Sequence, residues 1–183
     1  GALGVLTRWT TSTLAIERIY GDDLGVLKNA ELSNDGDRIV AITRDGDVLV
    51  YDVASGERLQ RLRTRALEAE ELTFSPDDAL LAVSNVAGTV YIFETSDWTL
   101  VEELQPFDIP SLGLSFSSDG ERLLTTAHDG RVSILATDTW LPLMTFRAHT
   151  QKIYAVVFDD AAERLLTCGG DGTVRVWPTR RGR

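Results

Sequence analysis

Cysteine, methionine and basic residues are scarce in this chain. Its 183 residues include one cysteine, Cys168, and one methionine. A single cysteine cannot form an internal disulfide, which argues against an oxidised, secreted scaffold. The 18 lysines and arginines are outnumbered by 28 aspartates and glutamates, and the net charge is −10. This acidity argues against general binding to nucleic acid, because a phosphate backbone is bound through lysine and arginine.

Long apolar runs are also missing. No run approaches the roughly 18 residues that a membrane-spanning helix requires, and no signal peptide is visible. We therefore expect a cytoplasmic protein that has no membrane partner. The sequence begins Gly-Ala-Leu-Gly rather than with methionine, and we expect further chain upstream of Gly1.

Histidine is too rare to build the usual catalytic or metal sites. His128 and His149 are the two histidines of the chain. Together with one cysteine they do not make a convincing zinc site, and no G-x-S-x-G nucleophile elbow is present. The glycine-rich run at 169–172 leads into a predicted strand, so it lacks the helix N-terminus that holds phosphate. We predict no enzyme activity, no cofactor and no metal.

What the chain does contain is a repeat of 42 residues. Its most regular markers are five glycines: Gly4, Gly46, Gly88, Gly130 and Gly172. Valines share a second register of the same period: Val48, Val90, Val132 and Val174. A period of this size falls in the range of the four-stranded blades of β-propellers.

Each repeat contains short apolar runs that are typical of β-strands. In the third full repeat these runs cover 114–117, 122–126, 132–136 and 141–146. Asp-Gly pairs at 45–46, 129–130 and 171–172 predict tight hairpin turns, because both positions of such a turn need a positive φ. No segment shows a helical period. The pattern predicts an all-β chain with four antiparallel strands in each repeat.

The last repeat is the most complete, and reads AHTQKIYAVVFDDAAERLLTCGGDGTVRVW over residues 148–177. This pattern resembles the WD-repeat β-propeller family. The resemblance implies a structural hydrogen-bonded quartet of four side chains in this repeat: His149, Thr167, Asp171 and Trp177. The other repeats carry different residues in the histidine register: Asp23, Arg65 and Phe107.

The resemblance implies β-propeller blades, about four of them, in an incomplete or partial ring. One propeller segment would cover residues 1–183. Residues 1–21 would end a first blade, residues 22–63, 64–105 and 106–147 would form full blades, and residues 148–183 would form a final blade without its fourth strand.

How such a ring would close has three possible answers. We expect the rest of a longer propeller chain to complete it, because open sheet edges expose unpaired backbone groups. One alternative is a four-bladed ring in which residues 14–20 complete the last blade. The other is a second copy of the chain that completes the ring.

The function implied by the resemblance is non-catalytic recognition of a protein or peptide, with a scaffolding role. The alternative is a C-terminal sensor or regulatory domain of a larger signalling enzyme, such as a kinase or a nucleotide-driven switch. Loops that vary on a repeated scaffold are the expected place for recognition. The predicted partner-binding residues are Arg44, Arg65, Phe107, His128 and Lys152. Phe107 would serve as an aromatic anchor and the basic residues would orient the partner by charge.

Three further residues have predicted structural roles. Trp98 and Trp140 share one register, and we expect each to cap the edge of its own blade, with an exposed binding strip as the alternative. Cys168 shares the register of Thr126 and is predicted to fill a strand position as a small apolar residue.

Overall fold

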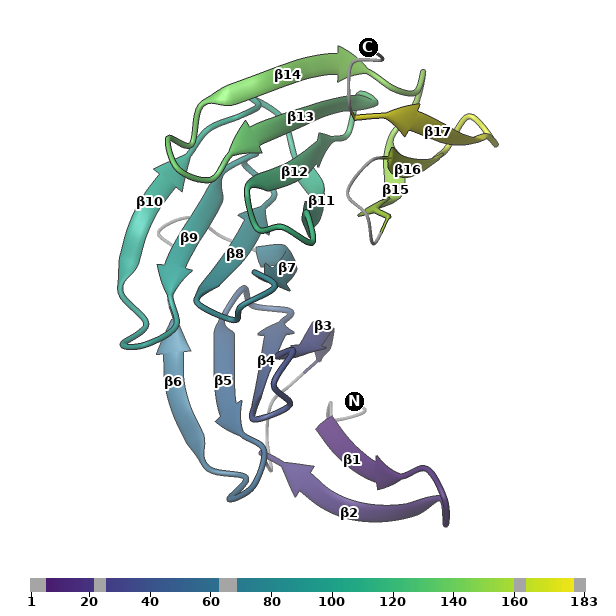
Figure 1. The fold of residues 1–183 in the computed structure, drawn as a ribbon. Coiled ribbons are helices and arrows are strands. Elements are labelled where there is room, and N and C mark those ends of the chain that lie inside the picture. Colours follow the sequence, from purple (N-terminus) through teal and green to yellow (C-terminus); the bar gives the residue numbers. More distant parts are fainter. Residues whose placement is uncertain (1–5, 22–25, 63–68, 160–163, 180–183) are drawn as a thin grey trace. The chain divides into compact units, whose positions relative to one another are not determined.

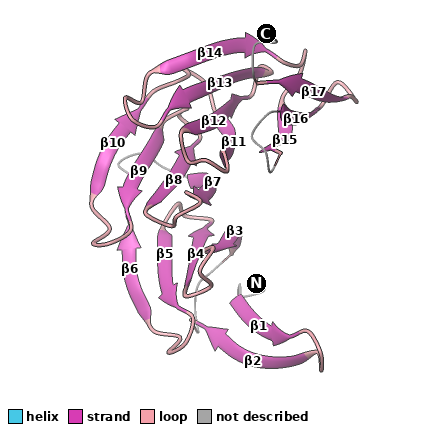
Figure 2. Cartoon of the chain, viewed as in Figure 1, coloured by secondary structure: helices cyan, strands magenta, loops and turns pink. Residues whose placement is uncertain are grey.

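The computed structural model describes residues 6–21, 26–62, 69–159 and 164–179 (Figure 1). These residues form strands and the turns between them, and none of them lies in a helix (Figure 2). It follows that no helix in the described part of the chain could cross a membrane. The chain divides into two compact units, unit 1 (residues 1–69) and unit 2 (residues 70–183).

Unit 1 holds two antiparallel sheets. In the first, β1 (Leu6–Thr10) pairs with β2 (Ala15–Tyr20). The second is a meander of four strands: β3 (Leu27–Leu32), β4 (Arg38–Thr43), β5 (Val48–Asp52) and β6 (Arg58–Leu62).

Unit 2 holds three sheets of the same design. The first contains β7 (Ala69–Phe74), β8 (Leu80–Asn85), β9 (Val90–Glu94) and β10 (Leu100–Leu104). The second contains β11 (Ser111–Phe116), β12 (Arg122–Ala127), β13 (Arg131–Ala136) and β14 (Pro142–Arg147). The third has three strands: β15 (Ile153–Phe158), β16 (Arg164–Gly169) and β17 (Val174–Pro178).

The predicted fold class is confirmed by these sheets. The described residues are all-β, and the four-stranded antiparallel sheets are those expected of propeller blades. The 42-residue period reappears in space, because Val48, Val90, Val132 and Val174 all lie in the third strand of their sheets. The assignment of the whole chain to a single propeller segment stays a prediction.

Successive sheets of unit 2 pack face to face. β11 contacts β8 of the sheet before it and β15 of the sheet after it. One apolar cluster joins Ala82, Val90, Ile92, Leu114, Phe116 and Leu123. The next joins Leu124, Val132, Ile134, Ala148, Ile153, Phe158 and Leu165. Burying each such aliphatic side chain contributes roughly 1.5–3 kcal/mol, so these faces hold unit 2 together.

The core of unit 1 follows the same plan. Tyr20 and Tyr51 meet edge to face with ring centroids 6.2 Å apart, and the Tyr20 hydroxyl donates to the Val53 carbonyl at 3.1 Å. Three periods later, Phe146 and Trp177 form the equivalent pair in unit 2, at 4.9 Å. The two aromatic pairs therefore mark corresponding points of the repeat.

The last sheet of unit 2 has one bare face. Val174 is 69 % exposed, whereas Val132, its counterpart one period earlier, is fully buried. Cys168 lies on β16 as predicted, yet it is exposed, while Thr126 in the same register is buried. The difference arises because β15 and β12 pack together, which covers the face that carries Thr126 and Val132.

Trp98 and Trp140 occupy the turn before the fourth strand in left-handed conformations, with φ of 62° and 56°. Gly56 fills the same register with φ of 77°. A left-handed tryptophan costs roughly 1–2 kcal/mol relative to glycine, so its side chain must offset that cost. Trp140 packs against the apolar cluster around Leu123, which favours the predicted capping role over an exposed strip.

Candidate functional site

Backbone contacts link the turns and connections at one end of unit 2 into a continuous surface. His128 N donates to Pro110 O at 3.0 Å, and Gly170 N donates to Lys152 O at 2.8 Å. Gly130 O accepts from the amides of Ala148 (2.8 Å) and His149 (3.1 Å). The set made of residues 105–110, 128–131, 147–154 and 170–173 is called the loop surface below.

Among the glycines of the loop surface, Gly130 lies closest to another segment of the chain. Its φ of 86° is a left-handed conformation that favours glycine. A Cβ atom at this position would lie 2.1 Å from the His149 carbonyl oxygen. The β12–β13 turn and the connection into the following sheet therefore approach more closely than any side chain at residue 130 would allow.

The four side chains of the predicted quartet lie in one hydrogen-bonded chain. His149 is buried, with Nδ1 2.9 Å from Asp171 Oδ1 and Nε2 2.7 Å from Thr167 Oγ1. The Trp177 indole N–H donates to Thr167 Oγ1 at 3.0 Å. Every donor finds an acceptor if the His149 Nδ1–H donates to the carboxylate and the Thr167 hydroxyl donates to Nε2. The arrangement ties the connection before β15 to β16 and to the β16–β17 turn.

Hydrogen bonds also fix the charge of Asp171. The Thr173 hydroxyl and then the His149 ring hold the pKa of this carboxyl far below its ordinary value. The second carboxylate oxygen accepts from the Thr150 amide at 3.2 Å. The imidazole of His149 is buried, and both of its ring nitrogens are occupied within the quartet.

The lowered pKa of Asp171 predicts that the free energy of unfolding depends on pH in the acidic range. Between the lowered pKa and the ordinary value near pH 4, the unfolded chain binds the proton more readily, so the free energy of unfolding falls as pH falls. Asp171→Asn should flatten that part of the profile between about pH 5 and pH 3. Urea titrations at stepped pH measure it. Equal slopes for the variant and the parent protein would contradict the assignment.

Phe107 occupies the register of His149 one period earlier, and it too turns inward. Its ring is 2 % exposed, and the Arg131 guanidinium lies over it with Cζ 5.2 Å from the ring centroid. Arg131 Nε donates to Asp129 at 2.7 Å. Phe107 is therefore unavailable as an aromatic anchor for a partner, which corrects that prediction. The connection packs this side chain into the sheet as it packs the histidine.

The other predicted partner-binding residues have different surroundings. His128 is exposed on the loop surface, and Lys152 is half-buried there with Nζ 4.5 Å from the ring centroid of Tyr154. Arg44 is exposed in the β4–β5 turn of unit 1. Arg65 lies outside the described residues. Three of the five, Phe107, His128 and Lys152, thus belong to the loop surface of unit 2, and of these the side chains of His128 and Lys152 reach solvent.

Sequence reasoning missed a cluster of charges on this surface. Arg131 contacts Asp129 at 2.7 Å and Asp108 at 3.3 Å, and Arg147 contacts Asp129 at 3.6 Å. Arg147 also donates to the Asp129 carbonyl at 2.7 Å. Arg131 and Arg147 are register partners across β13 and β14. Pairing these two strands on paper would have revealed the juxtaposition.

The described residues offer little that resembles a catalytic or metal centre. Among them, no three histidine, cysteine or acidic side chains gather where they could hold a metal ion. What the site presents is a surface of loops, joined by backbone hydrogen bonds, on stacked antiparallel sheets.

Comparison with known families agrees with this class. Residues 140–178 match the family described as WD domain, G-beta repeat. The match covers β15, β16, β17 and the quartet, and it confirms the predicted likeness to the WD-repeat family. A WD repeat is in general a protein-interaction unit and is typically non-catalytic. A search of curated proteins found no match to the chain.

Proposed function

We propose that the loop surface of unit 2 recognises a protein or peptide segment that carries carboxylates, and that the chain scaffolds an assembly through it. The observation that carries the proposal is the placement of basic side chains on interlocked loops. Arg147 and His128 are exposed there, and Lys152 is partly so. The backbone hydrogen bonds that join these loops keep the side chains in one arrangement.

Arg147 is the strongest candidate for direct contact. Its side chain is 57 % exposed, and one guanidinium nitrogen is fixed by the Asp129 carbonyl. A guanidinium presents five donors in a planar fork that matches a carboxylate. An arginine whose position is already set loses less side-chain entropy on binding than a free one.

Tyr154 supplies an aromatic surface in place of Phe107. Its side chain is exposed beside Lys152, whose ammonium group lies over the ring. Tyrosine and arginine are enriched among the residues that dominate interface energetics. A partner segment with an acidic residue next to an apolar one would satisfy both contacts.

The proposal predicts the outcome of a peptide selection. Peptides displayed on phage and selected on the intact chain should be enriched in aspartate and glutamate. Arg147→Glu should weaken a selected peptide by about 10-fold or more, because it replaces an attraction with a repulsion of similar size. Isothermal titration calorimetry measures the affinity.

Arg164→Glu is the matched control. Arg164 is 65 % exposed and also pairs with an aspartate, Asp159, but it begins β16 at the opposite end of the strand from the loop surface. Its substitution should leave the affinity unchanged. Equal loss in both variants, or selected peptides without acidic residues, would count against the loop surface as the recognition site.

A further inference from the structure

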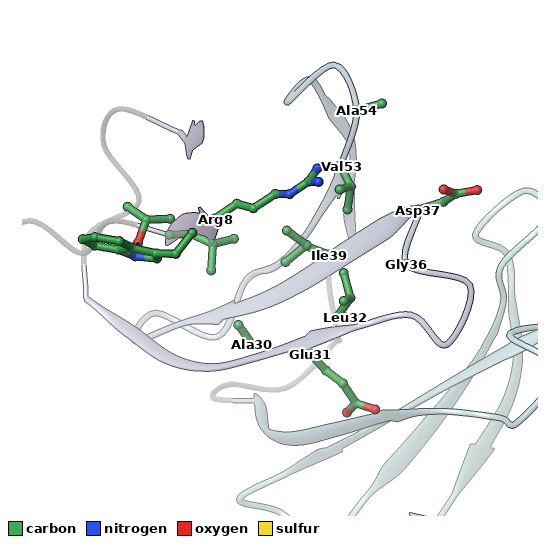
Figure 3. A pocket seen from close by; sticks show the side chains of 12 residues that line it. Arg8, Ala30, Glu31, Leu32, Gly36, Asp37, Ile39, Val53 and Ala54 are labelled. Carbon is green, nitrogen blue, oxygen red and sulfur yellow. The ribbon is translucent and has the colours of Figure 1, made fainter. Parts of the chain in front are cut away.

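Two pockets of unit 2 flank β14, and they are distinct from the pocket of about 640 Å³ that β1 and the sheet of β3–β6 line in unit 1 (Figure 3). The Trp140 hollow, of about 320 Å³, is lined by Leu135, Trp140 and Pro142. The Leu143 hollow, of about 410 Å³, is lined by Ala136 and Leu143. Leu135 and Ala136 are adjacent in β13, and adjacent residues of a strand point to opposite faces of a sheet. The sheet therefore has a hollow on each of its faces where β14 lies.

β14 is also the edge strand of its sheet. In the part of the chain that the structure describes, it pairs with β13 and with no other strand. Its second edge therefore presents backbone amide and carbonyl groups that can pair with an added strand. Pro142 has no amide hydrogen, so the edge available for pairing runs from Leu143 to Arg147.

β14 lacks the charged side chains of the corresponding strands. At the register of Met144 and Thr145, β10 has two glutamates, and β6 has a glutamine and an arginine. Charged side chains on an edge strand hinder its pairing with another chain. On β14, Leu143 is 60 % exposed and Met144 is 51 % exposed. This strand thus combines an open edge with an exposed apolar surface, which favours the addition of a strand.

The position of Arg147 indicates what binds along this edge. Arg147 is the last residue of β14, and it belongs to the loop surface. A segment whose carboxylate lies at Arg147 therefore reaches the free edge of β14 directly. Beyond the opposite end of the strand, the Leu143 hollow carries a net negative charge, from Asp138 and Glu121 against Arg122. Charge thus places the acidic residue of the segment at the Arg147 end of β14.

We propose that the acidic partner segment of the loop surface binds as an extended strand that pairs antiparallel with β14. This inference rests on the proposed function, because Arg147 holds the acidic residue. In the antiparallel direction, which is the more stable one, that residue stands at the N-terminal end of the bound strand. The residues after it alternate between the two faces, and those on one face place aliphatic side chains in the Trp140 hollow. Backbone hydrogen bonds give affinity, and the hollows select the side chains.

A designed peptide provides the probe. The peptide acetyl-DVTVTVK-amide has an aspartate at its N-terminal end and places its valines on one face of a strand. Labelled with a fluorophore, it should bind the intact chain with a Kd in the micromolar range, measured by fluorescence anisotropy.

Methylation of the peptide backbone tests the pairing without any change to the protein. Methyl groups on the nitrogens of the second, fourth and sixth residues block one edge of the peptide strand, and those on the third, fifth and seventh residues block the other. One of the two methylated peptides should bind at least about 10-fold more weakly, because it loses the hydrogen bonds to β14. The other should keep the affinity of the unmodified peptide.

The amides of β14 report the pairing directly. In NMR spectra of the intact chain, hydrogen exchange at alternate residues from Leu143 to Arg147 should slow at least about 10-fold when the peptide saturates the protein. Exchange at the amides of β10 should not change.

Two substitutions at the same register form a matched pair. Leu143→Lys should weaken the peptide about 10-fold, because a lysine on an edge strand hinders pairing and removes an apolar contact. Val101→Lys, at the corresponding exposed position of β10, should have no effect. Circular dichroism of both variants confirms that they are folded.

The results distinguish this inference from the proposed function. Equal affinity of the unmodified and both methylated peptides, together with a loss of affinity for Arg147→Glu, would overturn strand pairing and leave the loop surface as the recognition site. An affinity that Arg147→Glu does not change would contradict the proposed function, and this inference with it. An absence of binding by the unmodified peptide, or slowed exchange confined to the loops, would also overturn the added strand.

Discussion

Gly130→Ala should destabilise unit 2 by about 3–5 kcal/mol, whereas Gly172→Ala should cost only about 1–2 kcal/mol. Both glycines occupy the same turn register and share a left-handed φ, 86° at Gly130 and 77° at Gly172. The strain of a left-handed alanine is therefore common to both variants. The difference comes from what lies opposite the new methyl group.

At Gly130 the methyl group would lie 2.1 Å from the His149 carbonyl oxygen and 2.7 Å from the Gln151 carbonyl oxygen. These are backbone atoms of the connection into the next sheet, which cannot move without breaking the hydrogen bonds from Ala148 and His149 to Gly130. At Gly172 a methyl group meets no atom within 4 Å. The pair of variants thus isolates the contact between adjacent repeats.

Urea unfolding followed by tryptophan fluorescence measures both variants, since Trp98, Trp140 and Trp177 all lie in unit 2. The expected result is a large shift of the midpoint for Gly130→Ala and a small one for Gly172→Ala. Equal shifts would show that the β12–β13 turn does not lie against the following connection.

Thr167→Val should cost about 2–3 kcal/mol, although it changes the shape of the side chain little. The substitution removes the hydroxyl that joins His149 Nε2 to the Trp177 indole N–H. The buried Nε2 of His149 would then lose its hydrogen-bond donor, and the indole N–H would lose its acceptor. Leaving a buried polar group unpaired costs more than a hydrogen bond contributes when it forms.

Thr126→Val provides the matched control. Thr126 lies on β12, which corresponds to the strand β16 of Thr167, one residue after the counterpart of Thr167. Thr126 is as deeply buried as Thr167, but its hydroxyl has no hydrogen-bond partner among the described residues. Its replacement should be neutral or should stabilise the protein by up to about 1 kcal/mol. The free energy of unfolding should therefore fall for Thr167→Val and should stay unchanged or rise for Thr126→Val. A similar cost at both positions would remove the special role of Thr167.

Most of the fold was predictable because two features of the repeat constrain it. The 42-residue period fixed the number of strands in each sheet, and the Asp-Gly pairs placed the tight turns. Both signals are local, since a strand and its hairpin partner lie within about a dozen residues of each other. The quartet of His149 was also predictable, because all four residue types are present in one repeat.

The candidate site was less predictable, because burial depends on neighbours outside the repeat. Phe107 sits in a connection, where an exposed aromatic residue is an ordinary expectation, and only packing under Arg131 makes it inaccessible. The contacts of Arg147 with Asp129 join the end of β14 to the β12–β13 turn. Such contacts follow from strand register, which the turn pattern alone does not reveal.

The bare faces were missed for the same physical reason. Leu32 and Val174 are apolar residues at strand positions, and the sequence around them is like that of their buried counterparts. Whether such a side chain is covered depends on the sheet beside it.

Thiol labelling tests most directly whether adjacent repeats of unit 2 stack face to face. Cys168 is exposed, and its register mates Ser84 and Thr126 are fully buried. In the native protein, Cys168 should react with a water-soluble maleimide at the rate of a free thiol. Thiols introduced by Ser84→Cys or Thr126→Cys, each with Cys168→Ser, should react at least about 100-fold more slowly until denaturant is added. Comparable rates at all three positions would contradict the stacked arrangement.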